Sequence, residues 1–163
     1  MIFVTLGSQK FQFDRLLKKI DELIDEGIIK EDVFAQIGAS TYLPKNYKYT
    51  RFMDREEFSA HIENASLVVT HGGTGVIMGA VKRGKKVIAV PRLAKYGEHV
   101  DDHQLQLLRQ FDDLGIICYC KDVDDLGKSL NEVQNTVYRP YVSNTRAIID
   151  SIEDFLENIQ KEP

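Results

Sequence analysis

A glycine-rich run with one histidine carries the clearest chemical signal in the sequence: His71, Gly72, Gly73, Thr74 and Gly75. It follows an apolar stretch typical of a buried strand and precedes a segment with helical spacing. Glycines at such a junction leave the first backbone N–H groups of the helix free, and these groups favour an anion. Thr74 can cap the helix or donate to a phosphate oxygen. We interpret the run as a diphosphate site; the alternative is a packing turn in which His71 only satisfies nearby backbone groups.

This run does not match two common nucleotide-binding loops. The Gly-Lys-Ser/Thr ending of a P-loop is missing, and the glycines are not spaced as Gly-x-Gly-x-x-Gly. The interpretation therefore depends on anion chemistry and not on a nucleotide fingerprint.

A second run, residues 95–104, places acids, imidazoles, an amide and a phenol around a glycine. Carboxylates accept hydroxyl protons, and an amide both donates and accepts, so the mixture fits a sugar. Helix capping explains one aspartate of the run, but it does not require the other polar side chains. The polar members that we consider are Glu98, His99, Asp101, Asp102, His103 and Gln104.

Two histidines of this run, His99 and His103, stand four residues apart, as metal ligands on a helix often do. The run does not contain the His-Glu-x-x-His pattern of zinc enzymes. We therefore expect contacts with sugar hydroxyls and no metal ion.

A third loop, Gly7-Ser8-Gln9, follows the first apolar run of the chain. Glycine allows a close approach of backbone to a ligand, and the Ser8 hydroxyl can donate to a phosphate oxygen. The alternative is a tight turn without any ligand.

Charge is distributed unevenly along the chain. The segment 64–97 contains no Asp or Glu and six Lys or Arg, so it carries +6, while the remainder carries −10 of the net −4. Such a segment favours an anionic ligand, an anionic membrane surface or an acidic partner; the alternative is a solvated helix end followed by a charged turn. The isoelectric point of about 5.6 and the lack of a binding signature argue against nucleic acid.

Strands and helices alternate along the sequence, and most strands are continuous apolar runs, which is typical of a parallel sheet with helices on both faces. The ligand loops then share one edge, beyond the carboxyl ends of the strands. We expect strands at 1–6, 33–37, 47–52, 66–70, 86–90 and 116–120. We expect helices at 14–26, 54–64, 75–83, 100–115, 122–134 and 143–160, with a loop at 92–98.

Composition is that of an ordinary globular protein: of 163 residues, 43% are hydrophobic and 28% charged. We expect one domain, 1–163, located in the cytosol, because we find neither a signal peptide nor an apolar run of the roughly 20 residues that span a bilayer. Cys118 and Cys120 are too few for a disulfide scaffold and are expected to be buried thiols.

With these motifs in view, the chain resembles the C-terminal, donor-binding half of a GT-B glycosyltransferase of the family 28 type. It more closely resembles the PssE-type subunits of bacterial capsular and exopolysaccharide glycosyltransferases, and more distantly the eukaryotic two-subunit transferase of lipid-linked oligosaccharide synthesis. The matching stretches are Val4–Gly7, Phe13–Leu16, Gln36–Gly38, Thr70–Gly75, Gly84–Ile88, Pro91-Arg92 and Lys95–Gln104.

The resemblance implies one half of a split, inverting enzyme that takes its sugar from a UDP-sugar. A membrane-associated subunit would supply the other half and the lipid-linked acceptor, and would recruit this chain to the inner face of the cell membrane. Gly72–Gly75 would contact the diphosphate, while Asp102 and Gln104 would contact the donor sugar or ribose. Gly7 and Ser8 would lie in the cleft between the two halves. The basic segment 64–97 would hold anionic donor, lipid phosphate or headgroups.

The resemblance also has a gap. Related sequences often have a ribose-binding Glu eight residues after the motif histidine, and this chain has Gly79 there. No cofactor or metal is implied, and the general base is unassigned, with His71 and Glu98 as local candidates. Two other functions stay open: a non-catalytic accessory subunit, and a stand-alone nucleotide-binding module. The donor sugar and the acceptor linkage are not specified by the residues.

Overall fold

Six parallel strands form one sheet in the order β3-β2-β1-β4-β5-β6, in a computed structural model that describes residues 1–143. This order is that of a doubly wound, Rossmann-like sheet, as predicted. The strands are β1 (Ile2–Thr5), β2 (Val33–Gln36), β3 (Lys48–Thr50), β4 (Leu67–His71), β5 (Lys86–Val90) and β6 (Cys118–Tyr119). The α-helices are α1 (Asp14–Asp25), α2 (Arg55–Asn64), α3 (Thr74–Val81), α4 (His103–Asp113) and α5 (Leu126–Asn135), with short 3₁₀ helices η1 (Ala94–Tyr96) and η2 (Val123–Asp125).

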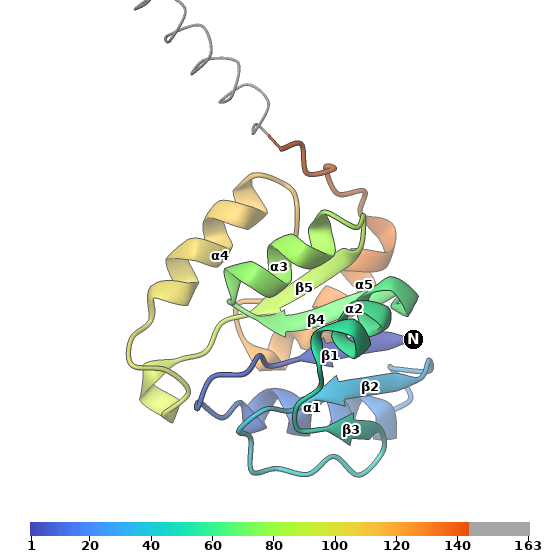
Figure 1. The fold of residues 1–163 in the computed structure, drawn as a ribbon, viewed down its shortest axis with the longest axis vertical. Coiled ribbons are helices and arrows are strands. Elements are labelled where there is room, and N and C mark those ends of the chain that lie inside the picture. The colour runs from blue at the N-terminus through green and yellow to red at the C-terminus, as the bar shows by residue number, and fades with distance from the viewer. Residues whose placement is uncertain (144–163) are drawn as a thin grey trace, which may run out of the picture.

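Alternate residues of each strand serve two cores, one on each face of the sheet. Val4 belongs to the core that also contains apolar residues of α1 and α5. Its neighbour Phe3 belongs to the core beneath α2, α3 and α4, the three helices on the near face in Figure 1. Both side chains are fully buried, and burial of one such side chain stabilises the fold by about 1.5–3 kcal/mol. This two-sided burial explains why the strands read as continuous apolar runs.

The predicted elements are confirmed with shifted boundaries. Asp54 begins α2 as an N-cap, its side chain accepting from the Glu57 N–H at 2.8 Å. The fourth helix begins at His103 and not near Val100, whose side chain is 74% exposed in a turn. The expected loop at 92–98 contains η1, and the helix expected at 143–160 lies outside the described residues. Cys118 and Cys120 are buried and unpaired.

In the described part of the chain, no helix has the length and apolar character needed to cross a membrane.

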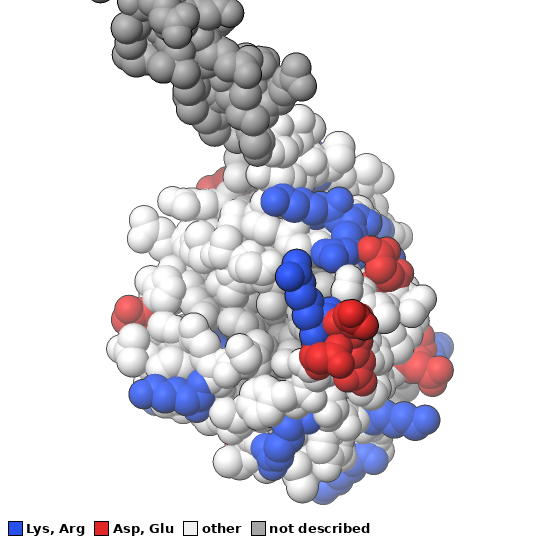
Figure 2. All heavy atoms as spheres, in the orientation of Figure 1, with Lys and Arg blue, Asp and Glu red and all other residues white. Residues whose placement is uncertain are grey.

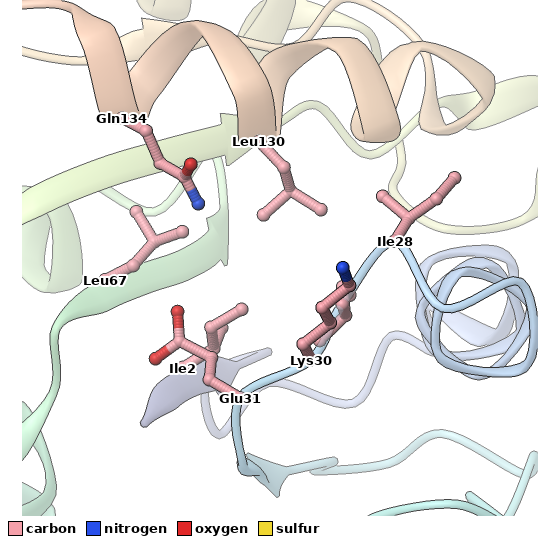
Figure 3. A pocket seen from close by; sticks show the side chains of 8 residues that line it. Ile2, Ile28, Lys30, Glu31, Leu67, Leu130 and Gln134 are labelled. Atoms are coloured by element: carbon pink, nitrogen blue, oxygen red, sulfur yellow. The ribbon is translucent and has the colours of Figure 1, made fainter.

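The edge of the sheet where the strands begin, which we call the amino rim (residues 1, 28–32, 66 and 67), has a hollow of about 380 Å³. Figure 3 shows Leu130 and Gln134 reaching down from α5 toward Ile2 and Leu67 at the starts of β1 and β4. The predicted site residues all lie at the other edge, so this hollow is a useful contrast to them.

Candidate functional site

The loops after β1 and β4 meet at the point where the strand order reverses. A Cβ atom built on Gly7 would lie 2.8 Å from His71 Nε2, so the two loops are in direct contact. Open α/β sheets bind ligands in the crevice at this reversal. We call this edge the carboxyl rim, comprising residues 5–13, 36–40, 70–75 and 91–104.

Gly7, Gly38 and Gly73 are among the rim glycines at which a larger side chain would clash with neighbouring atoms. Gly7 and Gly38 have positive φ values of 71° and 56°, and a Cβ on Gly38 would lie 2.7 Å from the Gly7 carbonyl oxygen. Gly73 has an ordinary φ of −76°, but a Cβ there would lie 2.8 Å from His71 Nε2 and closer still to Cε1. The fold itself therefore requires these glycines, whether or not a ligand binds beside them.

Gly75 has no such reason. A Cβ built there would have nothing within 4 Å, and the residue is exposed in the first turn of α3. Glycine inside a helix costs about 1 kcal/mol relative to alanine, and this cost has no packing benefit here. The open space beside Gly75 is where a ligand of the glycine run would lie.

The N-terminus of α3 has no side-chain cap. Gly73 is the N-cap residue and Thr74 is the first helical residue, so the predicted capping role of Thr74 is wrong. Thr74 and Gly75 are exposed. The first N–H groups of the helix therefore remain available to an anion at the carboxyl rim.

Gln104 joins the glycine run to the loop after β5. Its Oε1 accepts from Gly72 N at 3.1 Å and from Arg92 N at 2.9 Å. Because both partners are backbone donors, the orientation of the amide is fixed. Its Nε2 has no partner among the described residues and is absent from their buried unpaired atoms, which leaves this donor for a ligand. A Cβ on Gly72 would lie 2.8 Å from the Gln104 side chain, which explains that glycine.

Arg92 is a fully buried cation that ties β5 to the loop after β1. Its Nη2 donates to the carbonyl oxygens of Leu6 at 2.8 Å and Phe11 at 3.1 Å. Burial lowers the pKa of the guanidinium to about 10. Its Nε and Nη1 have no hydrogen-bond partner among the described residues. In the sequence, Arg92 is one charge of the basic segment and part of the Pro91-Arg92 match, and neither feature indicates this buried role.

Glu98 does not fit the candidate role of general base or donor contact. Its side chain is completely buried, and Arg15 holds it through Nε to Oε1 at 2.6 Å and Nη2 to Oε2 at 3.0 Å. The Leu93 N–H donates to Oε2 at 2.9 Å as well. A buried carboxylate with these partners fixes the loop after β5 and does not reach a substrate.

His71 is buried at the base of the glycine run. Burial, with Arg92 and His99 as nearby positive groups, lowers its pKa to about 3. The imidazole is therefore neutral at physiological pH, and its Nδ1 has no partner among the described residues. A neutral ring can orient a ligand through one N–H, but it brings no positive charge to a diphosphate.

The other predicted residues lie around the start of α4. Asp102 is exposed and accepts from Ala94 N at 2.8 Å through Oδ1. It is the N-cap residue of α4, but its side chain makes no capping hydrogen bond and instead holds the loop after β5. The His99 ring packs against Phe11, with ring centroids 4.9 Å apart and the ring planes tilted by 37°. His103 is exposed and contacts the Asp101 carboxylate. This contact, with Asp101 also accepting from the His103 N–H, lowers the pKa of Asp101.

A hollow of about 450 Å³ opens beside Asp102 and is lined also by Leu93, Lys95 and Lys121. It lies beside the start of α4, which carries Gln104, and the glycine run is not part of its lining. Ser8 is exposed after β1, and its side chain makes no hydrogen bond to the part of the chain that the structure describes.

A buried polar layer beneath the rim was not predicted. Thr70 Oγ1 donates to the Thr5 carbonyl oxygen at 2.8 Å, and Thr5 Oγ1 donates to Gln36 Oε1 at 2.6 Å. Thr5 and Gln36 are the last residues of β1 and β2, and Thr70 is the next-to-last residue of β4, so the layer runs across three adjacent strands. The available signal was a Thr or Gln at or next to the end of each predicted strand.

The basic segment is largely used within the fold. Lys85 Nζ donates to carbonyl oxygens at the end of α2, and Lys86 Nζ does so at the end of α5, where helix dipoles favour cations. Arg83 pairs with Glu63 at 2.9 Å. Figure 2 shows basic and acidic side chains lying next to one another toward the right of this face, with further charged side chains along its lower edge. Arg83, Lys85 and Lys86 are therefore used within the fold, and the anionic ligand expected for the segment stays a prediction.

Sequence comparison gives a family and three curated relatives. The glycosyltransferase family 28 C-terminal domain matches residues 1–159. The UDP-N-acetylglucosamine transferase subunit ALG13 of Homo sapiens is 27% identical over 132 residues, covering 73% of this chain and 11% of that protein. The Mus musculus subunit is 24% identical over 127 residues, covering 72% and 10%. The Eremothecium gossypii subunit is 38% identical over 68 residues, covering 41% and 32%. The chain thus spans about a tenth to a third of these relatives.

Structure comparison shows the fold of one part of larger glycosyltransferases. The glycotransferase of kitacinnamycin matches with a TM-score of 0.60 at 20% identity, covering 83% of this chain and 35% of that one. The calicheamicin glycosyltransferase CalG4 gives 0.59 at 15% identity, covering 83% and 34%. MurG of Acinetobacter baumannii gives 0.57 at 17% identity, covering 82% and 41%.

Proposed function

The chain belongs to the glycosyltransferase family 28 C-terminal domain family, and we propose that it is the catalytic, donor-binding subunit of a two-component inverting glycosyltransferase. Its donor is a UDP-sugar and its acceptor is a lipid-linked saccharide. The placement in capsule or exopolysaccharide synthesis follows from the resemblance to PssE-type subunits alone.

The observation that carries this proposal is the junction at the strand-order reversal. The glycine loop after β4 contacts the loop after β1 there, and α3 begins without a side-chain cap beside the open space at Gly75. A UDP diphosphate would accept hydrogen bonds from the first N–H groups of α3. The same groups would stabilise the charge that develops on the leaving diphosphate.

The donor sugar would lie on the Gln104 side of this junction. Gln104 uses Oε1 within the protein and presents Nε2 to a hydroxyl oxygen. Asp102 has one carboxylate oxygen engaged by Ala94 N, and the other can accept a hydroxyl proton. These two groups could bind hydroxyl groups of several hexoses, so they support a sugar site but do not identify the sugar.

We expect the general base to come from the partner subunit. An inverting transfer needs a base to remove the proton of the acceptor hydroxyl. Glu98 is buried and ion-paired, and His71 is buried beneath the glycine run. We expect the transfer to proceed without a cofactor or metal ion, because backbone N–H groups take the place of a cation at the diphosphate.

The partner subunit and the membrane location are part of the proposal. The curated relatives are named as subunits of a UDP-N-acetylglucosamine transferase, which supports a second component here. We propose that this component is membrane-associated, binds the acceptor and recruits the chain from the cytoplasm to the inner face of the membrane.

Gly75→Asp tests the diphosphate site without disturbing the fold. The new side chain meets no protein atom within 4 Å at its Cβ, and a carboxylate in the first turn of a helix is compatible with the dipole. It would repel a diphosphate, so UDP affinity measured by calorimetry should fall at least about tenfold. Ala60→Asp is the matched control, because it adds the same charge at an exposed position of α2. It should bind UDP like the wild type. Equal UDP affinity in all three proteins would contradict the proposal.

Sugar transfer to a lipid-linked acceptor tests the second component. Membranes from cells that co-express the chain with its membrane-associated partner should transfer sugar from a UDP-sugar, and the isolated chain should not. Full turnover by the isolated chain would refute the two-component enzyme while leaving UDP binding intact.

A further inference from the structure

Three side chains before and at the start of α4 bring potential metal ligands together. One nitrogen or oxygen atom from each of His99, Asp101 and His103 lies within 4.8 Å of the other two. His99 Nδ1 lies 3.3 Å from Asp101 Oδ1, and His103 Nδ1 contacts the same oxygen. Three ligand atoms therefore converge on one point at the surface of the carboxyl rim.

The spacing of these atoms suits a small divalent ion. Zinc at about 2.0–2.1 Å from tetrahedral nitrogen and oxygen ligands places those ligands about 3.3 Å from one another. The His99–Asp101 separation of 3.3 Å already has this value. Small rotations of the exposed Asp101 and His103 side chains would bring the set to the same spacing.

Neighbouring side chains fix the position of His99, whereas Asp101 and His103 are exposed and can adjust their positions. The His99 ring lies against Phe11 and His103, with centroids 4.9 Å away in both cases, and its side chain is only 11% exposed. Asp101 and His103 are 57% and 56% exposed. Solvent can therefore fill the remaining coordination positions, which makes this an open site.

The ligand types select the class of metal. Imidazole nitrogens with one carboxylate favour zinc, cobalt, nickel or copper, whereas magnesium and calcium prefer oxygen ligands only. We propose that His99, Asp101 and His103 bind one divalent late transition-metal ion, such as Zn²⁺, where the loop after β5 meets the start of α4. This proposal replaces the expectation from the sequence that the two histidines bind no metal ion. The ion would fix this loop against Phe11 and would not take part in sugar transfer, so the proposal stands independently of the enzyme activity.

Cobalt titration of the tag-free full chain at pH 7.5 tests the site, because Co²⁺ bound by imidazole and carboxylate absorbs visible light. We expect one Co²⁺ per chain, displaced by Zn²⁺ and not by Mg²⁺. Asp101→Asn and His103→Ala should each weaken Co²⁺ binding at least about tenfold. Both positions are exposed, so circular dichroism should show an unchanged fold.

His61→Gln is the matched control, because this histidine stacks on Phe34 of β2 and lies outside the cluster. It should bind Co²⁺ like the wild type. Failure to bind Co²⁺ or Zn²⁺ would overturn the proposal, since hydrogen bonds among the three side chains would then account for their positions. Binding that survives both cluster variants, or that Mg²⁺ reverses, would overturn it as well. None of these outcomes depends on UDP binding, so they leave the proposed function untouched.

Discussion

The two rims of the sheet differ in whether their polar side chains are buried or exposed to solvent. At the carboxyl rim, eight polar or charged side chains are buried: Thr5, Gln36, Ser40, Thr70, His71, Arg92, Glu98 and Gln104. At the amino rim, the Met1 amino group and Glu31 form an ion pair of 2.8 Å with side chains 25% and 40% exposed. Burial of a polar group is unfavourable unless partners compensate it, so the carboxyl rim carries a cost that the amino rim avoids.

The difference shows why a hollow alone does not identify a site. The amino-rim hollow of about 380 Å³ is lined by aliphatic side chains with Lys30, Glu31 and Gln134. Among the described residues, three of the four buried side-chain atoms without a partner lie at the carboxyl rim, on His71 and Arg92. Donors oriented by buried partners, and not volume, distinguish the rim suited to ligand chemistry.

The largest expected effect compares one glutamate from each rim. Glu98→Gln leaves Arg15 without its buried ion-pair partner, and we expect urea unfolding to show a loss of about 3 kcal/mol. Glu31→Gln removes a surface pair and should cost at most about 1 kcal/mol. Similar losses for the two variants would mean that the carboxyl rim is no more dependent on its buried groups than the amino rim.

Substitutions of Gln104 should give the next largest loss of stability. Two variants distinguish the structural role of Oε1 from the proposed sugar contact of Nε2. Gln104→Ala leaves the Gly72 and Arg92 N–H groups without an acceptor, and we expect a loss of about 2 kcal/mol in the free energy of unfolding. Gln104→Glu keeps an acceptor for both N–H groups and removes the free donor. It should unfold like the wild type while losing about 0.5–1.5 kcal/mol of the preference for UDP-sugar over UDP. An unchanged preference would remove Nε2 from the sugar contacts.

Periodicity and residue type were enough to predict the sheet, its helices and the shared edge of the ligand loops. The roles of Glu98 and Arg92 were not predictable, because they depend on Arg15 and Leu6, which lie far away in the sequence. Glycine spacing was likewise ambiguous: Gly73 is required by the His71 ring and Gly75 by nothing in the described protein. Local sequence carries propensity, whereas these partners are set by tertiary contacts.

The pH dependence of stability tests the buried imidazole. Burial lowers the pKa of His71 to about 3, so between pH 6.5 and 3 the unfolded chain binds a proton that the folded chain does not. Stability should therefore fall with decreasing pH by up to about 1.4 kcal/mol per unit in this window. His71→Asn should show a shallower dependence than the wild type in urea unfolding at pH 7, 6 and 5. Parallel curves for the two proteins would mean that the imidazole gains its proton in the folded state as readily as in the unfolded state.

The smallest effect is expected at the amino rim, where replacing an apolar side chain by a polar one should not change UDP binding. Ile28 lines the hollow there and is 50% exposed, so Ile28→Gln should change stability by no more than about 0.5 kcal/mol. UDP affinity by calorimetry should equal that of the wild type, because the proposed diphosphate site lies at the carboxyl rim. If Ile28→Gln weakened UDP binding tenfold while Gly75→Asp did not, the ligand would lie at the amino rim. The buried polar groups of the carboxyl rim would then serve the fold alone.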